Sequence, residues 1–81
     1  MTIQVYGTTQ CPNTRECLAA YAEKQLPHEF KDITELAVLK EFLALRDRES
    51  LFDAVKQEGR VGIPLIRTAE GAYTHDWKAL L

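Results

Sequence analysis

The stretch of sequence that decides the fold is Val5-Tyr6-Gly7-Thr8-Thr9-Gln10-Cys11-Pro12-Asn13-Thr14-Arg15-Glu16-Cys17. It starts in an apolar strand pattern and passes through Gly7 to reach Cys11 directly before Pro12. Proline suits the first turn of a helix, because the N–H that it lacks has no helical partner there. We therefore predict that Cys11 stands where a strand gives way to a helix.

A cysteine in that position is predicted to be reactive. The first N–H groups of a helix are unpaired and the helix dipole is positive at this end, so negative charge on the sulfur is favoured. Both effects lower the pKa of a thiol, and the thiolate is the nucleophilic form. The alternative is an unreactive cysteine at the end of a strand.

Hydrophobic periodicity extends the pattern along the chain. Alternating residues predict strands over 2–6, 28–33, 65–68 and 72–74. Apolar residues at helical spacing predict helices over 12–26, 36–46, 51–58 and 77–81. We expect Asp32 or Thr34 to cap the second helix and Asp76 to cap the last one.

The resulting order of elements, β-α-β-α-β-β-α, has few compact solutions. A helix joins the first two strands, which predicts a parallel pair with a right-handed crossover. A short turn at Ala69-Glu70-Gly71 joins the last two strands, which predicts an antiparallel hairpin. The expected fold is α/β and thioredoxin-like, with a four-stranded mixed sheet and helices on both faces. Cys11 would then lie at the carboxyl edge of the first strand, a usual place for active sites in open α/β sheets.

Size and composition set further limits. The chain has 81 residues, which predicts one domain over 1–81. Its net charge is −2 and the signs are interspersed, so no basic stripe indicates nucleic-acid binding. No apolar run approaches the roughly 20 residues of a membrane span. Two cysteines and the absence of a leader pattern lead us to expect a cytoplasmic protein. We also expect a monomer.

Three segments make the chain resemble the glutaredoxins. They are Tyr6-Gly7-Thr8-Thr9-Gln10-Cys11-Pro12, Gly62-Ile63-Pro64 and the hairpin after it. Within that group the chain is most similar to short bacterial glutaredoxin-related proteins, which share an Arg-Asp-x-x-x-x-Phe-Asp stretch, here Arg46-Asp47 and Phe52-Asp53. The resemblance implies a thiol–disulfide oxidoreductase with Cys11 as nucleophile and a cis Ile63-Pro64 bond beside it. It also implies glutathione as co-substrate, with no other cofactor, and disulfide-containing protein substrates.

Site residues follow from the motif and from this chain's departures from it. Thr14 stands where dithiol glutaredoxins have their second cysteine, so a single-cysteine cycle is expected in which an external thiol resolves the adduct. Pro12 would organise the helix start, and the Thr14 hydroxyl would stabilise the thiolate. The expected substrate-binding residues are Thr9, Gln10, Ile63, Pro64, His75 and Asp76. Thr8 replaces the family's lysine, and Thr74-His75-Asp76 replaces its glycine and acidic pairs.

Cys17 leaves two interpretations open. Six helical residues separate it from Cys11, which puts the two Cα atoms about 10 Å apart. Disulfides rarely span more than about 7 Å, so a Cys11–Cys17 bond would require the first turns to unwind. Cys17 is either a resolving cysteine under those conditions or a small buried apolar residue.

Other sites and functions have less support. The spacing of His28, His75 and the two cysteines does not indicate a metal site. Arg15 would stabilise the thiolate or belong to a solvated face, and residues 46–49 are interpreted as a charged joint between helices. The main alternative function is a non-catalytic thiol-sensing or protein-binding module of the same fold. A third possibility is an arsenate-reductase-like enzyme, but the sequence shows no clear set of arginines around Cys11 that would bind an oxyanion.

Overall fold

The computed structural model describes residues 2–81. Four strands form one mixed sheet in the order β2-β1-β3-β4. The strands are β1 (Ile3–Gly7), β2 (His28–Asp32), β3 (Leu65–Arg67) and β4 (Tyr73–Thr74). β1 is parallel to β2 and antiparallel to β3, and β3 is antiparallel to β4. The predicted parallel pair and C-terminal hairpin are therefore confirmed.

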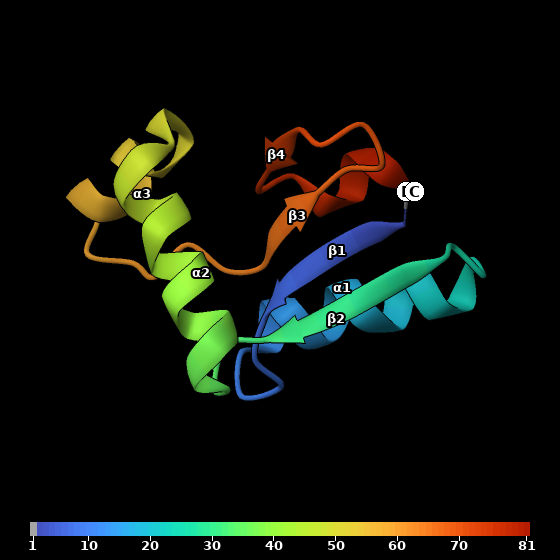
Figure 1. Ribbon diagram of the computed structural model, residues 1–81. Helices are drawn as coiled ribbons and strands as arrows, with labels where there is room; N and C mark the ends of the chain where they lie inside the picture. The colour runs from blue at the N-terminus through green and yellow to red at the C-terminus, as the bar shows by residue number, and fades with distance from the viewer. Residues whose placement is uncertain (1) are drawn as a thin grey trace.

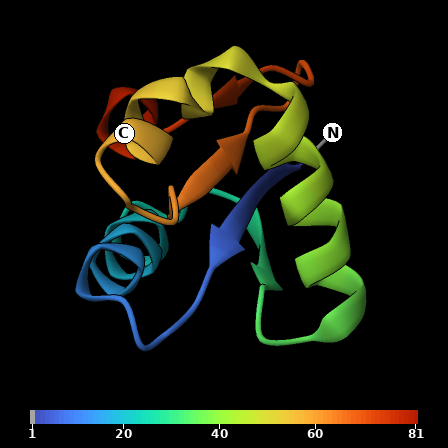
Figure 2. The ribbon, with the colours of Figure 1, turned by 90° about the vertical axis from the view of Figure 1, so that its left-hand side faces the viewer.

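The helices come between and after the strands. They are α1 (Pro12–Glu23), α2 (Leu36–Arg48), the 3-10 turn η1 (Ser50–Phe52), α3 (Asp53–Gln57) and the 3-10 turn η2 (Trp77–Leu80). Figure 1 shows the sheet with β1 at its centre, and in Figure 2 the sheet separates α1 from α2. The prediction of helices on both faces is confirmed. Within residues 2–81, no helix is both long and apolar enough to cross a membrane.

Two apolar cores occupy the two faces of the sheet. Adjacent strand residues point to opposite faces, so Val5 and Tyr6 enter different cores. One core joins α1 and η2 to the sheet through Val5, Cys17, Tyr21, Ile66 and Trp77. The other joins α2, η1 and α3 to it through Tyr6, Phe42, Leu45, Phe52, Val55 and Leu65. The single sheet thus carries a separate core on each face.

The helix ends and caps differ from the predictions. α1 ends at Glu23 and not at residue 26, and the helix predicted over 51–58 is divided into η1 and α3. α2 begins after Glu35, and the Asp32 carboxylate accepts hydrogen bonds from the backbone and hydroxyl of Thr34 instead of capping the helix. The cap predicted for α2 is wrong, because a local turn with Thr34 takes up the Asp32 carboxylate. Asp76 does occupy the predicted cap position before η2, but without the expected capping bond. The predicted last helix is a single 3-10 turn.

Candidate functional site

Cys11 is the residue that immediately precedes α1. Its backbone is extended, with φ −93° and ψ 119°, and its carbonyl accepts the first helical hydrogen bond from Arg15 at 3.1 Å. Pro12 takes the first helical position, as predicted. The Cys11 side chain makes no capping hydrogen bond, and the first N–H groups of the helix have no helical acceptor.

The surroundings of Cys11 favour its thiolate. Partial burial by itself would raise the pKa of the thiol, but the other contributions outweigh it and the pKa is lowered. The backbone N–H of Thr14, the Thr14 hydroxyl and the backbone N–H of Asn13 lower it because they would donate to a thiolate, and the Arg15 charge lowers it further. Arg15 is held beside the site by donating to the Thr9 carbonyl at 2.7 Å.

Thr14 lies buried beneath the thiol. Its side chain is fully inaccessible, and within residues 2–81 its hydroxyl oxygen has no hydrogen-bond partner of standard geometry. A Cys11 thiolate would supply the acceptor that this hydroxyl lacks. Gly7 makes room for Thr14, because a Cβ on Gly7 would come within 2.6 Å of Thr14 Oγ1.

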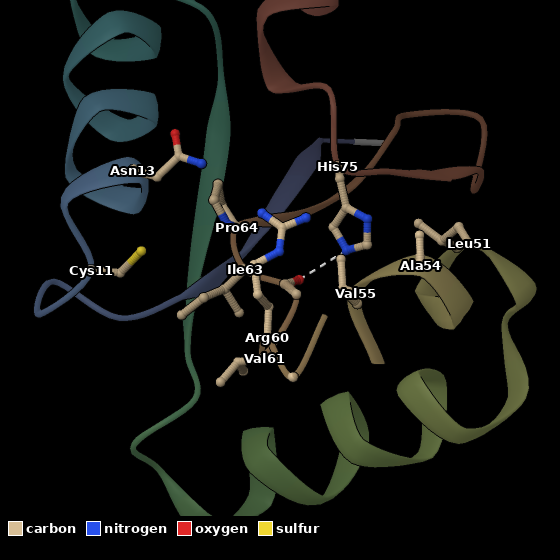
Figure 3. A pocket seen from close by; sticks show the side chains of 12 residues that line it. Cys11, Asn13, Leu51, Ala54, Val55, Arg60, Val61, Ile63, Pro64 and His75 are labelled. Atoms are coloured by element: carbon tan, nitrogen blue, oxygen red, sulfur yellow. Dashed lines mark hydrogen bonds between the residues drawn. The ribbon is translucent and has the colours of Figure 1, made fainter. Parts of the chain in front are cut away.

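A groove opens beside Cys11. Its volume is about 740 Å³, and Figure 3 shows the Cys11 side chain pointing into it toward Ile63 and Pro64. The residues that line it are Cys11, Asn13, Leu51, Ala54, Val55, Gly59, Arg60, Val61, Gly62, Ile63, Pro64 and His75. Most are apolar, and none of these described lining residues is a carboxylate. The groove is therefore an apolar surface with a positively charged side chain, Arg60, beside a thiol.

The loop before β3 forms the wall opposite Cys11. The Ile63-Pro64 peptide bond is cis, as the resemblance implied. The Ile63 backbone takes part in none of the turn, loop or cap hydrogen bonds between described residues. Gly62 has a φ of +94° and packs so closely on Phe52 that a Cβ would lie 2.8 Å from the ring. This position requires glycine for its backbone and for its packing.

His75 reaches the groove from the segment after β4. Its Nε2 lies 2.9 Å from the Gly62 carbonyl oxygen, and the Phe52 ring meets it edge-on at 4.9 Å. Burial lowers the pKa of His75, the hydrogen bond to Gly62 opposes that shift, and the Arg60 charge adds to it. The carbonyl is an acceptor, so the neutral imidazole carries its proton on Nε2.

The structure brings together only part of the predicted site. Cys11, Ile63, Pro64 and His75 line the groove, and Pro12 and Thr14 support Cys11. Thr9, Gln10 and Asp76 are exposed and are absent from its lining. The Thr9 carbonyl anchors Arg15, and the Gln10 backbone N–H donates to the Thr8 hydroxyl.

Cys17 lies away from the groove. It is fully buried in the core between α1 and the sheet, and both cysteines are free thiols. Burial raises the pKa of Cys17 to about 11, with a smaller opposing effect from a Tyr21 hydrogen bond. Its position is that of a small apolar residue of the core.

Sequence reasoning missed several groove residues. Asn13 lines the groove, and its Oδ1 accepts a hydrogen bond from Trp77 Nε1 at 3.0 Å. Because the indole is a donor only, the amide nitrogen of Asn13 is left for the groove, toward Pro64 in Figure 3. The position of Asn13 next to the Cys11-Pro12 pair was a usable signal. Arg60 carried none, since nothing distinguishes it from an ordinary surface arginine.

Neither a search for metal-ligand groups nor a comparison with known proteins assigns a function to the site. Among the residues the structure describes, no three His, Cys, Asp or Glu side chains gather as a metal site would require. Comparison of the chain with protein-family models, with curated proteins and with solved structures finds no match.

Proposed function

We propose that this protein has a thioredoxin-like fold and catalyses thiol–disulfide exchange with Cys11 as its single nucleophile. The observation that carries the proposal is the geometry at Cys11. The thiol precedes a helix, lies over a buried hydroxyl that lacks a partner, and lines a groove opposite Ile63-Pro64. The strand order and the helices on both faces support the proposed fold.

The proposed substrate is a mixed disulfide between a protein thiol and glutathione or a similar small thiol. The Cys11 thiolate attacks the sulfur of the small thiol, a new S–S bond forms, and the protein thiolate leaves and takes up a proton. A second molecule of small thiol, as its thiolate, then attacks the adduct. It releases the oxidised small disulfide and restores Cys11. The two electrons come from the small thiols, which a reducing cytoplasm supplies.

The groove supports this cycle in two ways. The hydrogen bonds at the start of α1 stabilise the attacking thiolate and, in the second step, the same sulfur as leaving group. The free backbone of Ile63 offers a donor and an acceptor to a peptide-like substrate. Arg60 and the Asn13 amide are further polar groups for such a ligand.

The test combines adduct detection with turnover. Incubation with oxidised glutathione should add one glutathione at Cys11, detected by mass spectrometry, and a glutathionylated peptide should be turned over with reduced glutathione. Cys11→Ser should abolish both reactions, and the matched Cys17→Ala variant should retain them. Failure of wild type to form the adduct would refute the proposal.

Two other outcomes identify specific alternatives. Loss of turnover in both cysteine variants would make Cys17 the resolving cysteine. An adduct without turnover would indicate the thiol-sensing or binding module instead.

A further inference from the structure

Three consecutive carbonyl groups in the groove wall are each held by a side chain from elsewhere in the fold. Arg46 in α2 donates from Nη2 to the Arg60 carbonyl at 2.8 Å and from Nε to the Val61 carbonyl at 3.0 Å. His75 donates from Nε2 to the Gly62 carbonyl at 2.9 Å, the bond drawn in Figure 3. The interpretation of residues 46–49 as a charged joint did not include these hydrogen bonds from Arg46 to the groove wall.

These contacts are more specific than those of an ordinary surface loop, whose carbonyls bind water. The guanidinium is a planar fork, so it fixes two neighbouring acceptors in one geometry. Phe52 holds the His75 ring edge-on and also packs against Gly62. Residues 60–62 are thus fixed from two sides, by α2 and by the segment after β4.

The consequence reaches the free backbone of Ile63. The Gly62 carbonyl and the Ile63 N–H belong to one peptide unit, which is planar. Fixing the carbonyl oxygen therefore fixes the direction in which Ile63 presents its N–H. We propose that Arg46 and His75 are positioning residues that hold the Ile63 backbone for pairing with a peptide-like disulfide; this inference rests on the proposed function.

The role predicts a selective defect. A disulfide with peptide groups, such as oxidised glutathione, can pair with the Ile63 backbone, whereas 2-hydroxyethyl disulfide has no peptide group. Loosening residues 60–62 should therefore slow the first reaction and spare the second. A purely structural role would slow both or neither.

The experiment measures second-order rate constants for Cys11 with each disulfide by stopped-flow mixing. In Arg46→Gln and His75→Leu, the ratio of the glutathione rate to the hydroxyethyl rate should fall at least about fivefold, the worth of about one hydrogen bond. His75→Gln, which keeps an N–H donor, should restore most of the ratio. Arg48→Gln is the matched control, because Arg48 is exposed and its side chain forms a hydrogen bond and ion pair with the neighbouring Glu49 and none with the groove wall.

Several outcomes overturn the inference. An unchanged ratio in both Arg46→Gln and His75→Leu would refute the positioning role and leave the proposed function standing. A wild-type protein that does not react with oxidised glutathione would refute the proposed function itself, and the positioning role with it. If Arg46→Gln fails to fold, Arg46→Lys replaces it, since lysine keeps the charge and cannot bind two carbonyls as a fork.

Discussion

At the scale of single residues, three residues around the start of α1 depend on one another. Cys11 supplies the sulfur, Thr14 supplies a buried hydroxyl, and Gly7 supplies the space that Thr14 fills. A buried hydroxyl without a partner costs free energy in the folded protein. The Thr14 hydroxyl is therefore better explained by the thiolate that it stabilises than by any contribution to stability.

Thr14→Val tests that explanation. Valine keeps the shape of the side chain and removes the hydroxyl, so the pKa of Cys11 should rise and alkylation by iodoacetamide at pH 7 should slow. The pH dependence of the alkylation rate gives the pKa directly. Thr9→Val, at an exposed threonine of the same loop, is the control. An unchanged pKa in Thr14→Val would show that the backbone N–H groups and Arg15 act alone.

Gly7→Ala should destabilise the protein through Thr14. The new Cβ would lie 2.6 Å from Oγ1 and 2.7 Å from Cγ2 of Thr14, an overpacking that typically costs about 1–3 kcal/mol. Urea unfolding measures the loss. Adding Thr14→Ala removes both clashing atoms, so the double variant should be more stable than the sum of the single changes predicts. If the two changes in unfolding free energy simply add, the clash with Thr14 is not the cause of the destabilisation by Gly7→Ala.

At the scale of elements, α1 begins after a residue that is not among the preferred helix caps. Serine, threonine, aspartate and asparagine are the residues that stabilise helix starts, since their side-chain oxygens accept a free N–H. Cys11 makes no such capping bond. A thiol therefore occupies a place where a hydroxyl would make the helix more stable.

The same substitution should thus have opposite effects at the two cysteines. Cys11→Ser should raise the free energy of unfolding by up to about 1 kcal/mol through a new capping bond. Cys17→Ser should lower it by about 1–3 kcal/mol, because its hydroxyl would be buried in an apolar core. Urea unfolding at mildly acidic pH, which disfavours the thiolate, compares the two variants. Destabilisation by Cys11→Ser would contradict the claim that a hydroxyl at this position caps α1 better than the thiol.

At the scale of the whole molecule, His75 makes stability depend on pH. Its pKa is lowered from the ordinary value of 6.5, mainly by burial, so the folded protein binds this proton less readily than the unfolded chain. Above pH 6.5 the imidazole is mostly neutral in both states. As the pH falls below 6.5, the unfolded chain takes up the proton first, so folding is weakened.

Urea unfolding between pH 5 and 7 tests this effect by comparison with His75→Gln. The difference in unfolding free energy between wild type and variant should shrink or change sign as the pH falls, because the variant lacks the titrating group. A difference that stays constant across this range would contradict the claim that His75 makes stability depend on pH. The other titratable groups do not affect this difference, because wild type and variant both contain them.

Much of the fold was predictable, because it depends on local patterns. The alternation in β1 and Pro12 before the helix each required only neighbouring residues. The short turn after β3 did too, and the parallel β1–β2 pair followed from the helix that connects them. The cap of α2 was not predictable in this way, because the Asp32 carboxylate accepts from Thr34 in a local turn that differs from a helix cap by only a residue or two.

The candidate site was predictable only where its residues belong to a short sequence motif. The motif that contains Cys11, Pro12 and Thr14 gave one side of the groove, and Gly62-Ile63-Pro64 gave the other. The contacts of Arg46 with residues 60 and 61 and of Trp77 with Asn13 join residues 14 to 64 positions apart. No local pattern encodes such pairs, because they exist only once the two faces of the sheet are packed.

The two cores have a consequence for how the groove can change over time. The thiol stands on α1, which packs in the core of Tyr21 and Trp77, whereas the Gly62 wall packs on Phe52 in the other core. Substitutions in one core therefore act first on one wall. The wall that faces Cys11 is therefore expected to tolerate a change of shape without a change in the packing that holds the thiol.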